Sequence, residues 1–225
     1  MVIDGCTGFG ADYAPSNTAL TIANLTTQWG TGDTAQGTLT TALAKAAGLI
    51  NARDIIFAPL NKLVTKVINN FNSTNASAQA KKDAKRLADK IRGFGVKVVR
   101  LPDGTPDPAH VSTSHQSFVN KADTFNEFVT FLSLDGNYAP NEVPIKVVTL
   151  QALYTSLKGQ NDGIGAVIAP VDGARVVRNK ALYDAGTGMV DTALKVKNYV
   201  KGLYGATSAQ ARLITRIKFT RGKRR

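Results

Sequence analysis

One pattern occurs twice along this chain, in the same order and with similar spacing. Tyr13-Ala14-Pro15 returns as Tyr138-Ala139-Pro140, an offset of 125 residues (138 − 13). Ser77-Ala78-Gln79-Ala80 returns as Ser208-Ala209-Gln210-Ala211, an offset of 131 residues (208 − 77). One or two loop insertions would account for the difference between the two offsets. The sequence therefore predicts two copies of one structural unit, and any function has to use a doubled scaffold.

The apolar positions between these two anchors repeat as well, and their spacing is helical. Apolar residues three and four positions apart fall on one face of a helix. The first copy has Ile22, Leu25, Trp29, Leu39, Ala42, Leu43 and Ala46, which align with Val147, Leu150, Tyr154, Ile164, Val167, Ile168 and Val171 in the second. Arg53 aligns with Arg178 in the same register. The repeated pattern predicts that both copies are helical.

We expect four helices in the first copy. The first runs from Pro15 to about Trp29, and an Ala-rich helix that ends near Ile50 follows it. Gly30, Gly32 and Asp33 should end the first helix and separate it from the second. A third helix starts at Pro59, and a fourth starts at Ser77 and ends at Gly93. Four helices joined by short loops favour an up-and-down bundle.

The second copy should be less regular than the first. Pro170 falls where the first copy has Lys45, inside the second helix of the unit. A proline there removes one backbone hydrogen bond, so we expect it to kink or split that helix.

The fold class that follows is all-α, with two tandem up-and-down bundles over residues 1–95 and 138–225. Residues 96–137 should join them through a Pro-rich linker. Within this segment, residues 96–101 alternate enough for a short extended strand, and 102–108 have the composition of an exposed loop. The apolar spacing from Phe118 to Leu132 predicts an additional helix, although the run 128–134 also suits a strand.

The sequence argues against membrane insertion and secretion. No uninterrupted apolar stretch approaches the ~20 residues that a membrane-spanning helix needs. The first residues carry Asp4 and no early Lys or Arg, which does not match a secretory signal. We expect a protein of the cytoplasm or of the interior of a particle. Cys6 is the only cysteine, so an intrachain disulfide and a Cys-based metal site are excluded.

The residues that could carry catalysis or bind a metal form no known constellation. His110 and His115 lie in the linker near Asp103 and Asp107, but their spacing does not match a zinc site, and a Pro-rich loop cannot preorganise ligands. Cys6 could use one of these histidines as a base only if the fold joined two distant loops. We therefore predict no metal and no catalytic group.

Two glycine-rich segments also fail as nucleotide-binding loops. Gly5, Gly8 and Gly10 have no preceding strand, as the dinucleotide-binding motif requires. The segment 30–37 has no Gly-Lys-Ser/Thr, so a flexible turn between helices is the sounder interpretation. We expect no cofactor and no small-molecule substrate.

Positive charge collects at the end of each copy. The chain has a formal net charge of +12, with eight basic and two acidic residues in 81–100 and ten basic and one acidic in 191–225. Such clusters attract nucleic-acid phosphates or acidic protein surfaces, although they can also be solvated faces. The predicted polyanion-binding residues are Lys81, Lys82, Lys85, Arg86, Lys90, Arg92, Arg212, Arg216, Lys218, Arg221, Lys223, Arg224 and Arg225.

These observations favour a non-enzymatic structural or assembly protein, a scaffold that acts through protein–protein contacts of its duplicated bundle. It would be a homo-oligomer or part of a larger assembly, in which the acidic segment 101–145 complements a neighbour's basic end. The alternative is a nucleic-acid-associated protein that contacts the phosphate backbone through both basic ends, because few aromatic residues accompany them. An enzyme whose site combines scattered residues between the bundles is a third possibility.

Overall fold

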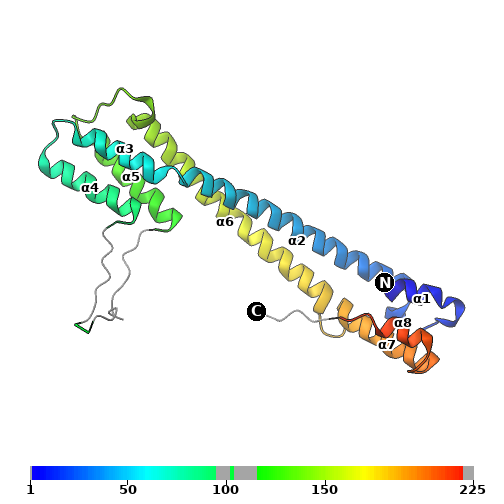
Figure 1. Ribbon diagram of the computed structural model, residues 1–225. Helices are drawn as coiled ribbons and strands as arrows, with labels where there is room; N and C mark the ends of the chain where they lie inside the picture. The colour runs from blue at the N-terminus through cyan, green and yellow to red at the C-terminus, as the bar shows by residue number, and fades with distance from the viewer. Residues whose placement is uncertain (1, 95–101, 104–115, 220–225) are drawn as a thin grey trace. The chain divides into compact units, whose positions relative to one another are not determined.

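The computed structural model describes residues 2–94, 102–103 and 116–219, and all regular structure within them is helical (Figure 1), which confirms the all-α prediction. The predicted strand at 96–101 and most of the Pro-rich linker lie outside the described residues. The elements are α1 (Val2–Gly8), η1 (Gly10–Asp12), η2 (Thr18–Leu20), α2 (Ile22–Phe57), α3 (Leu60–Asn72), α4 (Ala78–Arg92), α5 (Phe118–Leu134), η3 (Val143–Ile145), α6 (Val147–Tyr183), α7 (Met189–Tyr204) and α8 (Ala209–Thr215).

Helix α2 runs without a break through the glycines that were expected to end it. Its 36 residues correspond to about 54 Å of helix at ~1.5 Å per residue. The prediction of two helices here was wrong, because glycine within a helix costs only about 1 kcal/mol relative to alanine and other interactions can offset that cost. Gly32 itself is buried, and a Cβ there would overlap the Met189 sulfur, so the glycine permits a close approach of α7.

Helix α6 likewise continues through Pro170, so the prediction that this proline could split the helix was wrong. Pro170 lies on an exposed part of the helix, as does Ala166 one turn earlier. The Ala166 carbonyl, which loses its helical partner to the proline, can therefore be hydrated.

Both long helices bury a narrow seam with a period close to 3.5 residues. Buried positions spaced alternately by three and four produce the seam of a left-handed pair of helices. On α2 the buried or half-buried seam residues are Leu25, Gln28, Gly32, Ala35, Leu39, Ala42, Ala46 and Leu49; on α6 they are Leu150, Leu153, Leu157, Gln160, Ile164, Val167, Val171 and Ala174.

Contacts divide the chain into unit 1, residues 1–46 and 167–225, and unit 2, residues 47–166. This division cuts across the predicted boundaries at 1–95, 96–137 and 138–225, because α2 and α6 each contribute residues to both units.

In unit 1, α1 and the start of α2 pack against α7 and α8. Buried residues of all four helices form one core that includes Cys6, Leu25, Val196 and Ile214. Further along, Leu39 of α2 packs with Val171 and Ala174 of α6. Gly32 lies beside Leu182, so residues earlier in α2 meet residues later in α6. The two helices therefore run antiparallel within this unit.

In unit 2, α3, α4 and α5 enclose the larger core, together with the ends of the long helices. Phe71, Phe125 and Phe128 are fully buried in it. The helices that the sequence predicted after Pro59, after Ser77 and from Phe118 are confirmed as α3, α4 and α5. The Ser77 side chain caps α4 by accepting from the Ala80 amide, and Gly93 ends the helix with a left-handed φ of 80°.

The continuity of α2 can be tested at two of its glycines. Gly30→Ala and Gly37→Ala should each raise the free energy of unfolding by about 0.5–1 kcal/mol, because open space surrounds both positions and alanine favours a helix. Urea denaturation measures the change. Gly93→Ala is the matched control and should destabilise, since its positive φ and the adjacent Gln116 side chain disfavour a Cβ. Loss of stability in both helix variants would contradict a continuous helix.

Candidate functional site

The basic residues of α4 fall into an engaged set and a free set. Lys81 donates to the Thr74 carbonyl at 2.6 Å, and Lys85 pairs with Asp89 at 2.6 Å. Lys82, Arg86 and Lys90, by contrast, form no ion pair with any side chain in the described part of the chain. These three cations are the ones available to an external anion.

Arg92, the last basic residue of α4, is bound within unit 2. Its guanidinium donates to the Ala88 carbonyl at 3.3 Å, to Thr65 Oγ1 at 3.2 Å and to the Asp89 carboxylate, and only 13% of the side chain is exposed. Burial alone would raise the pKa of Asp89, but hydrogen bonds from Lys85 and Arg92 outweigh it and hold this pKa below its ordinary value. Arg92 therefore ties α4 to α3.

A hollow of about 440 Å³ lies beside Arg92 and brings two further cations to this surface. Lys62 and Lys66 of α3 line it, with Phe94 following α4. The Arg92 guanidinium lies 5.1 Å from the centroid of the Phe94 ring. Sequence reasoning missed Lys62 and Lys66 as site residues, although their spacing of four already placed them on one helix face. They extend the predicted basic patch from one helix to two.

The C-terminal basic residues lie in the other unit. Arg212, Arg216 and Lys218 are exposed there, whereas the remaining predicted cations Arg221, Lys223, Arg224 and Arg225 lie outside the described residues. The structure therefore does not bring the two predicted patches together in one unit. Lys197 adds a cation, since its ammonium donates to the Ile217 carbonyl and lies 4.7 Å from the centroid of Phe219. Burial, with a smaller effect from Lys201, lowers the pKa of Lys197.

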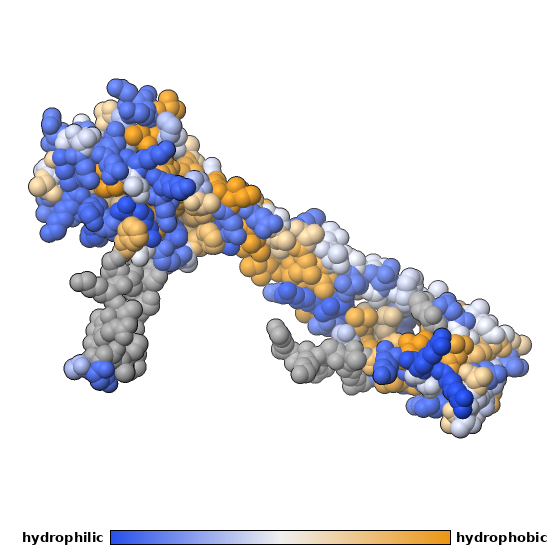
Figure 2. All heavy atoms as spheres, in the orientation of Figure 1, coloured by the Kyte–Doolittle hydropathy of each residue, from blue (hydrophilic) through white to orange (hydrophobic). Residues whose placement is uncertain are grey.

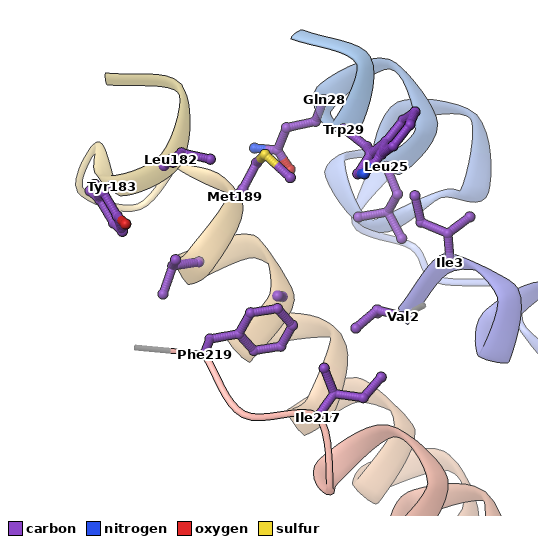
Figure 3. A pocket seen from close by; sticks show the side chains of 12 residues that line it. Val2, Ile3, Leu25, Gln28, Trp29, Leu182, Tyr183, Met189, Ile217 and Phe219 are labelled. Atoms are coloured by element: carbon purple, nitrogen blue, oxygen red, sulfur yellow. The ribbon is translucent and has the colours of Figure 1, made fainter. Parts of the chain in front are cut away.

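Unit 1 also contains an apolar pocket of about 250 Å³ (Figure 3). Its walls come from α1, α2, the end of α6, α7 and the segment that follows α8. Figure 3 shows Val2, Leu25 and Phe219 around it, with Trp29 and Met189 nearby. Gln28 is the main polar group, and its amide already donates to the Thr187 carbonyl at 2.5 Å and to Thr192 Oγ1 at 3.2 Å. The pocket therefore suits apolar side chains.

The residues considered for catalysis are either buried or outside the described residues. Burial raises the pKa of the Cys6 thiol, which disfavours the nucleophilic thiolate. Gly5 and Gly8 belong to helix α1 and form no phosphate loop. His110 and His115 are not described. Within the described ranges, no three His, Cys, Asp or Glu side chains gather as a metal site, and no helix combines the length and apolarity needed to cross a membrane.

Searches of protein-family models, curated proteins and solved structures find no match to this chain. The functional argument therefore depends on the geometry of the molecule itself.

The Asp89 contacts predict a pH-dependent stability. Asp89→Asn should lower the free energy of unfolding by about 1–2 kcal/mol at pH 7, because Arg92 and Lys85 lose a charged acceptor. The folded-state pKa of Asp89 is lowered, so its contribution is present above the ordinary carboxyl pKa of 3.8 and is lost as the pH falls through the folded value. Urea denaturation at several pH values checks this. The two proteins should converge in acid, and a difference that stays constant down to about pH 2 would contradict the assignment.

Proposed function

We propose that this chain is a non-enzymatic scaffold or assembly protein, built from a duplicated helical unit and acting through protein–protein contacts with further copies of itself. The duplication has local support in two tyrosines. The Tyr13 hydroxyl donates to the Leu20 carbonyl at 2.8 Å, and the Tyr138 hydroxyl donates to the Ile145 carbonyl at 2.7 Å. Each bond spans seven residues and fixes a short 3-10 turn before a long helix.

The elements that follow these tyrosines correspond in the same way. The turns η2 and η3 and the starts of α2 and α6 are all related by the 125-residue offset. Helices α3 and α7 begin 129 residues apart (189 − 60). Ser77 and Ser208 then cap α4 and α8 alike, each accepting from the backbone amide three residues later.

The two copies exchange their halves. Unit 1 combines the front of the first copy, residues 1–46, with the back of the second, residues 167–225. Unit 2 contains the back of the first copy and the front of the second. In oligomers, exchange of identical elements between subunits is known as domain swapping. Here both partners of the exchange belong to one chain. The contacts between the two copies within the chain are thus of the kind that subunits make, which supports an assembly protein.

The observation that carries the proposal is a set of exposed apolar side chains on the long helices within unit 1. Their seam is already buried through Leu39 and Val171, yet Ile168 is 54% exposed and Val176 is 68% exposed. Leu43 is also exposed, and it occupies the position in α2 that Ile168 occupies in α6. Figure 2 shows hydrophobic residues on the surface of these helices. Contiguous exposed apolar residues mark interaction surfaces on soluble proteins, so this face suits a second copy.

Self-association can be tested by light scattering coupled to gel filtration. We expect a mass at least twice the 23.9 kDa of one chain at micromolar concentration, and we expect it to persist in 1 M NaCl because apolar contacts are not screened by salt. Leu43→Ser with Ile168→Ser and Val176→Ser should return the protein to a monomer. Leu134→Ser removes a side chain that is 82% exposed at the end of α5 and should leave the mass unchanged. A wild-type monomer at all concentrations would contradict the proposal.

A second candidate function is contact with a nucleic-acid backbone. The observation that favours it is that Lys62 and Lys66 of α3 line one hollow with Arg92 of α4, in the same unit as the free cations of α4. Cations on two neighbouring helices can meet successive phosphates, and each contact adds to the salt dependence of binding. No aromatic platform beyond Phe94 accompanies them, so contacts would be to phosphate.

Binding to duplex DNA of random sequence, measured by fluorescence anisotropy across salt concentrations, tests this second function. Lys62→Ser with Lys66→Ser should weaken binding and reduce the slope of log K against log salt by about 2. Lys45→Ser with Lys180→Ser removes the same charge from exposed positions of unit 1 and should leave the slope nearly unchanged. Equal effects of the two double variants would indicate attraction by net charge alone and would exclude a site at α3 and α4.

A further inference from the structure

The apolar pocket of unit 1 is open where the corresponding part of unit 2 is filled. With the 125-residue offset, Leu25 and Trp29 at the pocket correspond to Leu150 and Tyr154 in unit 2. With the offset of α7 from α3, Ala193 corresponds to Val64. The unit 2 residues belong to or pack against a closed core, whereas Trp29 is 42% exposed.

In unit 2 the first part of α5 packs over the surface that corresponds to the pocket. The same offset aligns α1 with residues 127–133 of α5. The covering residues, 118–126, form the part of α5 that precedes this aligned stretch. Phe118, Ala122 and Phe125 belong to this part. They are spaced i, i+4 and i+7, the pattern by which an amphipathic helix fills an apolar groove.

In unit 2 these residues seal the core. Ala122 and Phe125 are buried with Leu60 and Val64 of α3. The Phe118 ring lies 4.8 Å from the ring of Phe57. Two polar groups from the long helices also contact Phe118, one at its ring and one at its backbone carbonyl.

Those two groups receive the start of α5. The Arg53 guanidinium lies 4.0 Å from the centroid of the Phe118 ring, and Asn161 donates to the Phe118 carbonyl at 3.1 Å. The first is a cation–π contact, and the second adds a hydrogen bond to a carbonyl in the first turn of α5. One long helix therefore holds the ring and the other holds the backbone.

Unit 1 retains the equivalent receiving groups without an occupant in the structure. Leu182 lines the pocket at the position of Phe57, and Arg178 occupies the position of Arg53. The Arg178 guanidinium donates only to the side chain of its neighbour Asn179, at 3.0 and 2.8 Å. Gln36 occupies the position of Asn161, and its amide makes one long bond of 3.4 Å to Thr40. The aromatic and backbone contacts of α5 thus have potential partners here.

We propose that this pocket binds an amphipathic helix of a partner protein that carries two aromatic side chains seven residues apart with a small residue between them. The inference rests on the duplication argued under Proposed function. A volume of about 250 Å³ is below the roughly 300–1,000 Å³ of small-molecule sites, and the lining is mostly apolar, with the Gln28 amide already bonded to Thr187 and Thr192. Such a helix would place its aromatic side chains in the pocket and beside Arg178, as α5 does beside Arg53.

Trp29 provides the readout, because it is the only tryptophan of the chain and lines the pocket. The probe is a synthetic peptide of residues 117–134, which contains α5 with its Ser117 cap and no tryptophan. Titrated into the full-length protein, it should shift the Trp29 emission to shorter wavelength in a saturable manner. The same peptide with Phe118→Ala and Phe125→Ala should bind at least about tenfold more weakly, as expected for aromatic anchors.

Two protein variants locate the binding. Ala193→Phe fills the pocket from α7 and should abolish the response, whereas Leu194→Phe changes an exposed neighbour and should not. Should Ala193→Phe fail to fold by circular dichroism, Arg178→Gln provides the test on a side chain outside the pocket lining and should weaken binding about threefold. An unshifted Trp29 emission, equal binding of the two peptides, or a response unaffected by the pocket variants would overturn the proposal.

The result of this experiment can be distinguished from that of the self-association experiment. The self-association variants change Leu43, Ile168 and Val176, none of which lines the pocket. A protein that oligomerises but does not bind the peptide would contradict the helix-binding site and leave the scaffold proposal standing. A monomer that binds the peptide would contradict the scaffold proposal and leave the helix-binding site standing.

Discussion

The narrow seam along α2 and α6 is the constraint on which the rest of the molecule depends. A period near 3.5 residues gives each long helix one buried stripe. Leu39 packs on the other long helix, at Val171, whereas Leu25 packs on the shorter helices of its unit. Small seam residues leave little area to bury, and Gly32 permits the close approach of Met189 from α7. Apolar side chains outside the stripe, such as Ile168 and Val176, therefore stay exposed. These exposed side chains are the ones on which the proposed self-association depends.

The two units differ in how completely their apolar residues are covered. In unit 2 the full length of α5 closes the core over Leu60 and Val64. In unit 1 the corresponding surface carries a pocket that Trp29 and Met189 border. The two units thus present different apolar surfaces, and the proposed helix-binding site belongs to unit 1.

The helices α3, α4 and α5 could be predicted from the sequence because each has a clear stripe and a cap, as with Ser77 and Gly93. The continuity of α2 and α6 could not be predicted from the sequence. Local propensity disfavours Gly30 and Pro170 in a helix, and only long-range packing offsets that cost. The combination of residues 1–46 with 167–225 in one unit was also hidden, because an apolar pattern does not say which other segment of the chain it packs against. Among site residues, the α4 cations were identified, but Arg92 proved to be internally bound, and Lys62 and Lys66 were recognised only when α3 and α4 were seen together.

The exchange has a physical consequence for how the fold holds together. Neither residues 1–95 nor residues 138–225 contain a complete core, because unit 1 combines residues 1–46 with 167–225 and unit 2 spans 47–166. The buried tyrosines illustrate this, since the Tyr13 ring packs edge-on against Tyr199 and the Tyr138 ring packs edge-on against Phe71, each from the opposite copy. Removing one half of the chain would thus expose apolar surface in both units at once. We therefore expect the two ends of the chain to fold cooperatively, and the proposed self-association depends on that folding.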